Sequence, residues 1–174
     1  STVNTAVNIL QHERWKMSCI MYKKLRDFVI YVPSAGMLQW WHVCRHSTVL
    51  SRKCKTLIRL IAGESNLSSG NGRYMMNSTH CPLCCSYQEE SVHHFLLECD
   101  GLKTVRGLLL PKVLDSMPPA MRHCFQQKNF SEQTVFLLGQ MGRTFVPEWW
   151  AIQRAIIELV HELYRARQEL VLQH

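Results

Sequence analysis

Apolar residues recur at helical spacing along much of this chain. The clearest case is residues 48–62, where the apolar side chains fall on one helical face: Leu50, Cys54, Leu57, Ile58 and Ile61. Residues 13–31 and 147–172 carry similar stripes. Because an α-helix has about 3.6 residues per turn, these stripes predict three amphipathic helices.

Two shorter segments also fit helices. Residues 102–117 form a mixed apolar stretch closed by "MPPA", and residues 131–142 form an apolar stretch that begins at Ser131. Serine is a preferred N-cap residue, so we expect the second helix to start there. No segment shows the sustained alternation of a half-buried strand. The pattern therefore predicts a mainly α fold.

The breaks between these segments predict the domain organisation. "ESNLSSGNGR" at residues 64–73 is rich in Gly and Ser and polar throughout, which is typical of a linker. We expect a basic helical lobe over residues 1–65, a linker over 66–77, a small zinc knuckle over 78–101 and a C-terminal helical lobe over 102–174. The knuckle would then be inserted between the two helical lobes.

Charge is distributed unevenly along the chain. Of 174 residues, 47% are apolar and 19% charged, as in a globular protein. Residues 1–80 have a charge balance of +8, whereas residues 81–174 have a balance of −1. This asymmetry favours a polyanionic partner, most often nucleic acid, over a basic surface that is merely soluble. No run of about 18 apolar residues occurs, so we expect no membrane partner.

The candidate nucleic-acid-binding residues lie on the predicted helices. Arg52, Lys55 and Arg59 step by three and four along the face opposite the apolar stripe. A row of long basic side chains on a fixed helix suits a phosphate backbone, and the alternative is a solvated face. Further lysines on the first helix would extend the row: Lys16, Lys23 and Lys24.

The segment "STHCPLCCSYQEESVHHFLLECDG", residues 78–101, gathers four cysteines and three histidines. Cys81 and Cys84 form a C-x2-C pair, and His94 and Cys99 form an H-x4-C pair. Zinc takes four such ligands in a tetrahedron, usually as two close pairs joined by a loop. The segment is too short for a hydrophobic core of its own. We therefore predict one structural Zn²⁺ ion held by these four residues.

Two ligand positions stay open. Cys85 could replace Cys84 in a C-x3-C pair, and His93 could replace His94, although the spacing favours Cys84 and His94. A disulfide framework is not expected, because the N-terminal sequence lacks the pattern of a secretion signal. We accordingly expect a cytoplasmic and nuclear protein. The other alternative is a group of unliganded cysteines in a core.

Local signals also predict the shape of the second ligand pair. Ser91 is suited to cap a short helix that carries His94 in its first turn. The "DG" at residues 100–101 is expected to stop that helix just after Cys99.

The same segment resembles a known family. "CPLCCSYQEESVHHFLLEC" closely resembles the C-terminal zinc knuckle of non-LTR (LINE-type) retrotransposon reverse transcriptases, which read CPxC, a short acidic loop and H-x-L-L-x-C. The flanks "CKTLIRLIAGESNL" and "CDGLKTVRGLLL" are similar to the family's neighbouring helices, with Arg106 at the usual basic position. The resemblance covers about residues 50–110. The doubled Cys84–Cys85 departs from the pattern.

The resemblance implies a module that follows the polymerase thumb, with residues 1–65 close to the thumb. Its partners would be the upstream polymerase domain of the same polypeptide and the template RNA or target DNA of target-primed reverse transcription. The chain has no adjacent Asp pair and no Pro-Asp, and Asp115 is the only Asp after position 100. We therefore expect no catalysis by this segment. The alternative function is a zinc-knuckle protein-interaction domain, including one domesticated from such an element.

Overall fold

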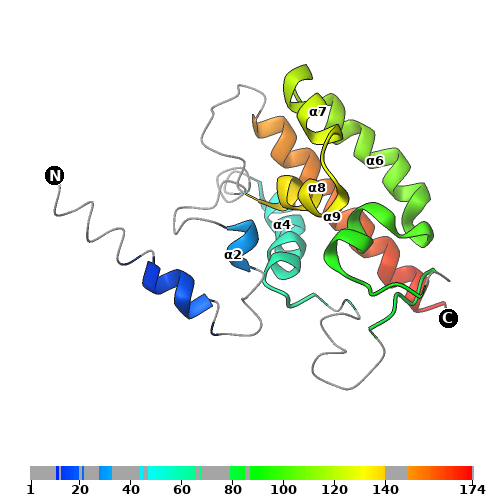
Figure 1. The fold of residues 1–174 in the computed structure, drawn as a ribbon. Coiled ribbons are helices and arrows are strands. Elements are labelled where there is room, and N and C mark those ends of the chain that lie inside the picture. The colour runs from blue at the N-terminus through cyan, green and yellow to red at the C-terminus, as the bar shows by residue number, and fades with distance from the viewer. Residues whose placement is uncertain are drawn as a thin grey trace.

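Helices build almost all of the regular structure (Figure 1). The structure, a computed structural model, describes residues 11, 13–19, 21, 28–32, 44, 47–65, 67, 79–84, 87–139 and 149–173. Residues 13–19 are helical, and the helices that follow are α2 (Phe28–Tyr31), α4 (Thr48–Ile61), a π-helical turn (His94–Glu98), a 3₁₀ turn (Asp100–Leu102), α6 (Lys103–Asp115), α7 (Pro119–Gln126), α8 (Phe130–Leu138) and α9 (Trp149–Val171). The predicted mainly α fold is confirmed.

The helix α4 forms where its apolar stripe predicts. Ser47 adopts an extended backbone conformation and its side chain accepts a hydrogen bond from the Leu50 N–H, which satisfies one of the unpaired donors of the first turn. Cys54 and Leu57 are buried on the inner face, together with Leu60 and Ile61.

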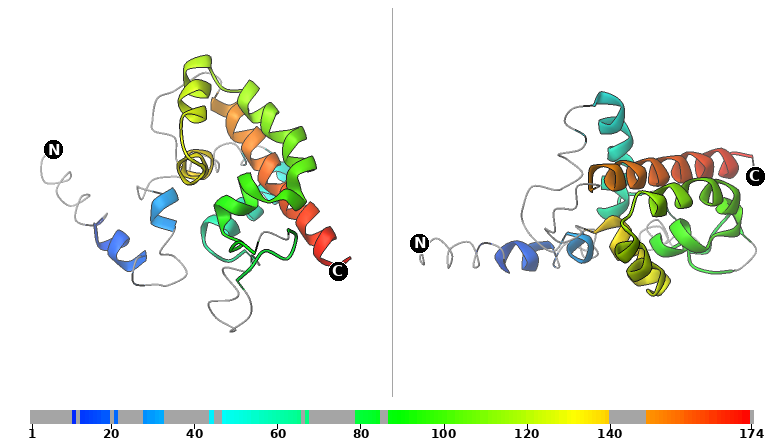
Figure 2. Two further views of the ribbon diagram at one scale, coloured as in Figure 1. Left: turned by 45° about the vertical axis from the view of Figure 1, so that its right-hand side comes forward. Right: turned by 90° about the horizontal axis from the view of Figure 1, so that it is seen from above.

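The core lies along both sides of α9, which packs against α4 on one side and α6 on the other (Figure 2). Its predicted stripe is buried from Ile152 to Leu163. Two polar contacts tie α9 to α4: Thr56 Oγ1 lies 3.2 Å from His161 Nδ1, and Lys53 Nζ lies 3.1 Å from Glu162 Oε1. Buried side chains of the cysteine-rich segment belong to the same cluster.

Two elements of the C-terminal half differ from the sequence prediction. The predicted helix start at Ser131 is wrong, because Asn129 caps α8 instead. Its Oδ1 accepts from Glu132 N at 2.9 Å, and Glu132 Oε2 accepts from Asn129 N at 3.1 Å. This reciprocal capping box satisfies two donors at once. In addition, the segment "MPPA" starts a helix that the sequence analysis did not predict. Pro119 is the first residue of this helix, α7.

The part of the chain that the structure describes contains no strand, and the nearest approach to one is an isolated antiparallel bridge between His80 and Glu89. None of the described helices combines the length and the apolar character that a membrane crossing would need. The proposed division into lobes stays a prediction. The linker beyond Leu67, up to residue 78, lies outside the described residues.

Candidate metal centre

Backbone hydrogen bonds shape the turn that carries Cys81 and Cys84. Cys81 N donates to Gln88 O at 2.9 Å, and Glu90 N donates to Thr79 O at 2.9 Å. These two bonds join the ends of the loop and so hold the backbone on which the C-x2-C turn is built.

The second pair comes from the π-helical turn. Ser91 Oγ accepts from His94 N at 3.2 Å, as the predicted cap requires. Cys99 N then donates to His94 O at 2.8 Å, which is a bond between residues five apart. In an ordinary α-helix, residues five apart would point about 140° away from each other. The wider π-helical turn joins the two residues directly.

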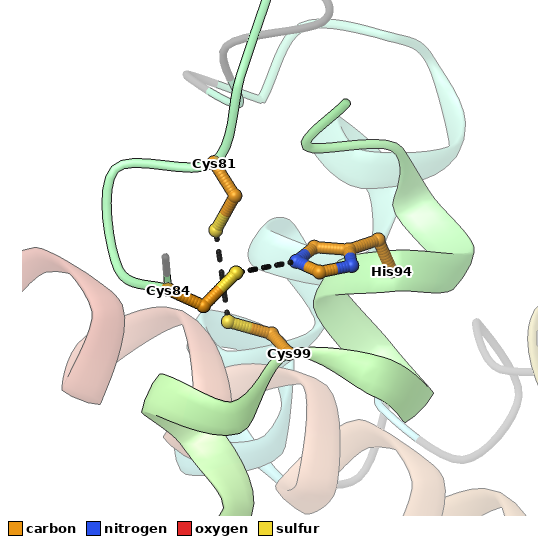
Figure 3. A group of neighbouring side chains, drawn as sticks. All are labelled: Cys81, Cys84, His94 and Cys99. Carbon is orange, nitrogen blue, oxygen red and sulfur yellow. Dashed lines mark hydrogen bonds between the residues drawn. The ribbon is translucent and has the colours of Figure 1, made fainter. Parts of the chain in front are cut away.

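The four predicted ligand residues lie together (Figure 3). Their ligand atoms are all within 4.8 Å of one another. Cys81 Sγ lies 3.6 Å from Cys99 Sγ, and Cys84 Sγ lies 3.3 Å from His94 Nε2. A tetrahedral zinc site with Zn–S of about 2.3 Å and Zn–N of about 2.0 Å has edges of about 3.8 Å and 3.5 Å. These four residues could therefore bind a metal ion.

The chemistry of the group also fits a cation. Burial, together with the nearby Cys99 thiol, raises the pKa of the Cys81 thiol to about 12, and burial also raises the pKa of Cys99. Burial lowers the pKa of His94. Without a cation the thiols thus stay protonated at neutral pH, and a divalent ion would supply the charge that stabilises thiolates here. None of the described cysteines forms a disulfide.

Of the two alternative ligand residues, one lies outside the group and the other lies outside the described residues. His93 lies outside the group, with its ring nitrogens 3.0 and 3.2 Å from Ser91 Oγ. Cys85 lies outside the described residues. The other histidine of the segment, His80, is exposed and meets Tyr87 edge-on, with ring centroids 6.4 Å apart.

A buried ion pair, which the sequence analysis missed, fastens this segment to α9. The Glu90 and Arg167 side chains are 1% and 7% exposed, and Arg167 Nη2 donates to Glu90 Oε2 at 2.8 Å, with a second bond from Nε. Arg167 lies four residues after Leu163 on the buried face of α9. A charged residue continuing an apolar stripe was the available signal for this arginine.

Arg106, on α6, also contacts the segment. It is 9% exposed, and its Nη2 donates to Cys99 O at 2.8 Å. A Zn²⁺ ion with three thiolates would carry a net charge of −1, which this guanidinium is placed to offset. The resemblance had marked Arg106 as a basic position without a role.

The helix that carries His94 ends where the sequence predicts, because the π-helical turn closes at Glu98 and Cys99 has a non-helical backbone conformation. Asp100–Leu102 then forms a separate 3₁₀ turn that leads directly into α6. Glycine is required at position 101 for space, since a Cβ there would lie 2.6 Å from Leu83 O. Leu83 of the C-x2-C turn thus packs directly against this glycine.

Gly101→Ala should therefore destabilise the zinc-loaded protein by about 1–3 kcal/mol, because Leu83 belongs to the backbone of the C-x2-C turn and must shift. Gly107→Ala is a matched control on α6, where an added Cβ meets nothing within 4 Å. That change should stabilise the helix by about 0.5–1 kcal/mol. Urea denaturation measures both, and equal effects of the two substitutions would contradict the close-approach role.

The candidate nucleic-acid-binding residues occupy two helical segments. Arg52, Lys55 and Arg59 are all exposed on α4. Lys16 is partly buried, and its Nζ lies 3.4 Å from Glu13 Oε1. The other two lysines of the predicted row, at positions 23 and 24, lie outside the described residues.

Comparison with known proteins adds no family. The chain matches no protein-family model, no curated protein and no solved structure. The resemblance to the reverse transcriptases therefore rests on the motif and its flanks within about residues 50–110.

Proposed function

We propose that this chain is a zinc-stabilised nucleic-acid-binding module without catalytic activity of its own. We further propose that it is the C-terminal region of a non-LTR reverse transcriptase, where it would hold template RNA or target DNA. The observation that carries the binding function is the exposed basic row on α4, defined by Arg52, Lys55 and Arg59.

Zinc is the metal that the ligand set supports best. Three sulfur atoms and one imidazole nitrogen in a tetrahedral arrangement suit Zn²⁺ rather than Mg²⁺ or Ca²⁺, which prefer oxygen. All four positions of the tetrahedron are filled by protein side chains, as in structural sites, so no position is left open for a substrate.

The basic row has the features of a phosphate-binding surface. Within the described part of the chain, none of its three side chains forms an ion pair, whereas Lys53 on the same helix pairs with Glu162. The seven steps from Arg52 to Arg59 rise by about 10 Å. Successive phosphates of one strand are about 3.4 Å apart along the axis of a duplex, so the row is long enough to meet three of them. The inner face of α4 is fixed in the core.

A triple Ala variant of Arg52, Lys55 and Arg59 should bind RNA or DNA more weakly, whatever the nucleotide sequence. Losing three phosphate contacts should flatten the plot of log K against log salt by roughly 2–3 units. The melting temperature should barely change, because exposed charges contribute little to stability. Mobility-shift titrations from low to physiological salt, with RNA and with single- and double-stranded DNA, measure the slope.

The Lys103, Lys112 and Lys128 triple Ala variant is the matched control, because it removes the same charge from outside α4. Its salt slope should stay close to that of the wild type. Equal slopes for all three proteins would contradict binding by the α4 row. If the wild type binds no nucleic acid at all, the protein-interaction alternative is favoured instead.

A further inference from the structure

One atom of the candidate metal centre is left without a partner. His94 is 2% exposed, and its Nε2 faces Cys84 Sγ at 3.3 Å. The opposite ring nitrogen, Nδ1, is buried and has no hydrogen-bond partner among the described residues. Because Nε2 is the atom placed to bind a metal, Nδ1 must then carry the ring proton. A buried N–H of this kind needs an acceptor.

The nearest acidic group is the Glu98 carboxylate. Its Oε2 lies 3.8 Å from His94 Nδ1, on the next turn of the same π-helical segment. A hydrogen bond needs about 2.9 Å, so the carboxylate must approach by about 0.9 Å. Glu98 has room to do so, because its side chain is 28% exposed and lines a cavity of about 300 Å³ beside Cys84 and His94.

We propose that Glu98 is a positioning residue for the metal centre: its carboxylate accepts a hydrogen bond from the Nδ1–H of His94 and so fixes the ring with Nε2 toward the metal. This inference rests on the proposed metal site. A carboxylate behind a ligating histidine holds the tautomer and makes the ligand nitrogen more basic. A metal bound at Nε2 would keep the ring proton on Nδ1, and the Glu98 carboxylate would then approach this N–H.

The surrounding groups are consistent with this role. His93 Nε2 lies 3.7 Å from the same Glu98 oxygen, but His93 is exposed and also contacts Ser91. Asp100 lines the same cavity, and no hydrogen bond or ion pair joins it to His94 within the described residues. Glu98 is thus the acidic group that meets the unpartnered nitrogen.

The test compares Zn²⁺ affinity, measured by chelator competition, in the wild type and three variants. Glu98→Ala removes the acceptor and should weaken Zn²⁺ binding by roughly 10–100-fold. Glu98→Gln keeps an oxygen acceptor without the charge and should lose less. Glu89→Ala removes an equal charge from an exposed position of the same segment and should match the wild type.

NMR of the zinc-loaded protein gives a second readout that a merely structural role would not move. The His94 Nδ1 proton should be slow to exchange in the wild type and fast in Glu98→Ala. The proposal is overturned if Glu98→Ala binds Zn²⁺ as tightly as the wild type, or if Glu89→Ala loses as much affinity. A wild type that binds no Zn²⁺ would overturn the metal site itself, and the proposal with it.

Discussion

Removal of zinc with a chelator should unfold residues 79–102 while most of α9 stays helical. Structural zinc sites of this kind contribute roughly 10–16 kcal/mol of apparent binding free energy, much of it coupled to local folding. The segment also supplies Phe95, Leu96 and Leu97 to the core, so the packing against α6 and α8 should loosen as well. Hydrogen exchange of the backbone amides measures the extent of the change.

Single substitutions separate the ligands from other cysteines. Cys84→Ser should lose the metal and reproduce the exchange pattern of the chelated protein. Cys124→Ser is the matched control, because Cys124 is exposed on α7 and lies outside the ligand group. Chelation that leaves the exchange of residues 79–102 unchanged would contradict the coupling between metal and fold.

Arg167→Met should destabilise the zinc-loaded protein by about 3–5 kcal/mol. The substitution removes the guanidinium that forms the ion pair with the Glu90 carboxylate, which is 1% exposed. Combining it with Glu90→Leu should recover much of the loss, because an apolar pair leaves no buried charge uncompensated. Equilibrium denaturation of the single and double variants measures both effects.

Arg165→Ala provides the control on the same helix. Arg165 is 64% exposed and pairs with Glu162 and Glu169 at the surface, so its loss should change stability by at most about 1 kcal/mol. If Arg167→Met proves as mild as Arg165→Ala, the buried pair does not fasten the cysteine-rich segment to α9.

The sequence predicted those elements that depend on interactions between residues close together in the chain. The apolar stripes place α4 and most of α9, because burial of one face decides where such helices form. The candidate ligands lie within two short stretches, so the spacings C-x2-C and H-x4-C were enough to point to four residues that the structure brings together.

Two features that the sequence did not predict depend on contacts between residues that are apart in the sequence. Glu90 and Arg167 are 77 positions apart and meet only because the loop and α9 pack together. The need for glycine at position 101 arises from the approach of Leu83.

The start of α8 was misplaced because Ser131 and Asn129 are both good caps, and only Asn129 has a glutamate three residues later.

The helix α7 was missed for another reason. It has only 8 residues and begins in a proline pair, and such a pair also marks the end of the helix before it. Proline in the first turn of a helix is tolerated, because the N–H that it lacks would have no partner there.

Zinc K-edge X-ray absorption of the protein, purified without chelator, tests the central claim most directly. The proposed site predicts one zinc per chain with three sulfur atoms at about 2.3 Å and one nitrogen at about 2.0–2.1 Å. Protein that contains no zinc, or a zinc shell of four sulfur atoms or mainly of oxygen, would contradict a centre built from Cys81, Cys84, His94 and Cys99.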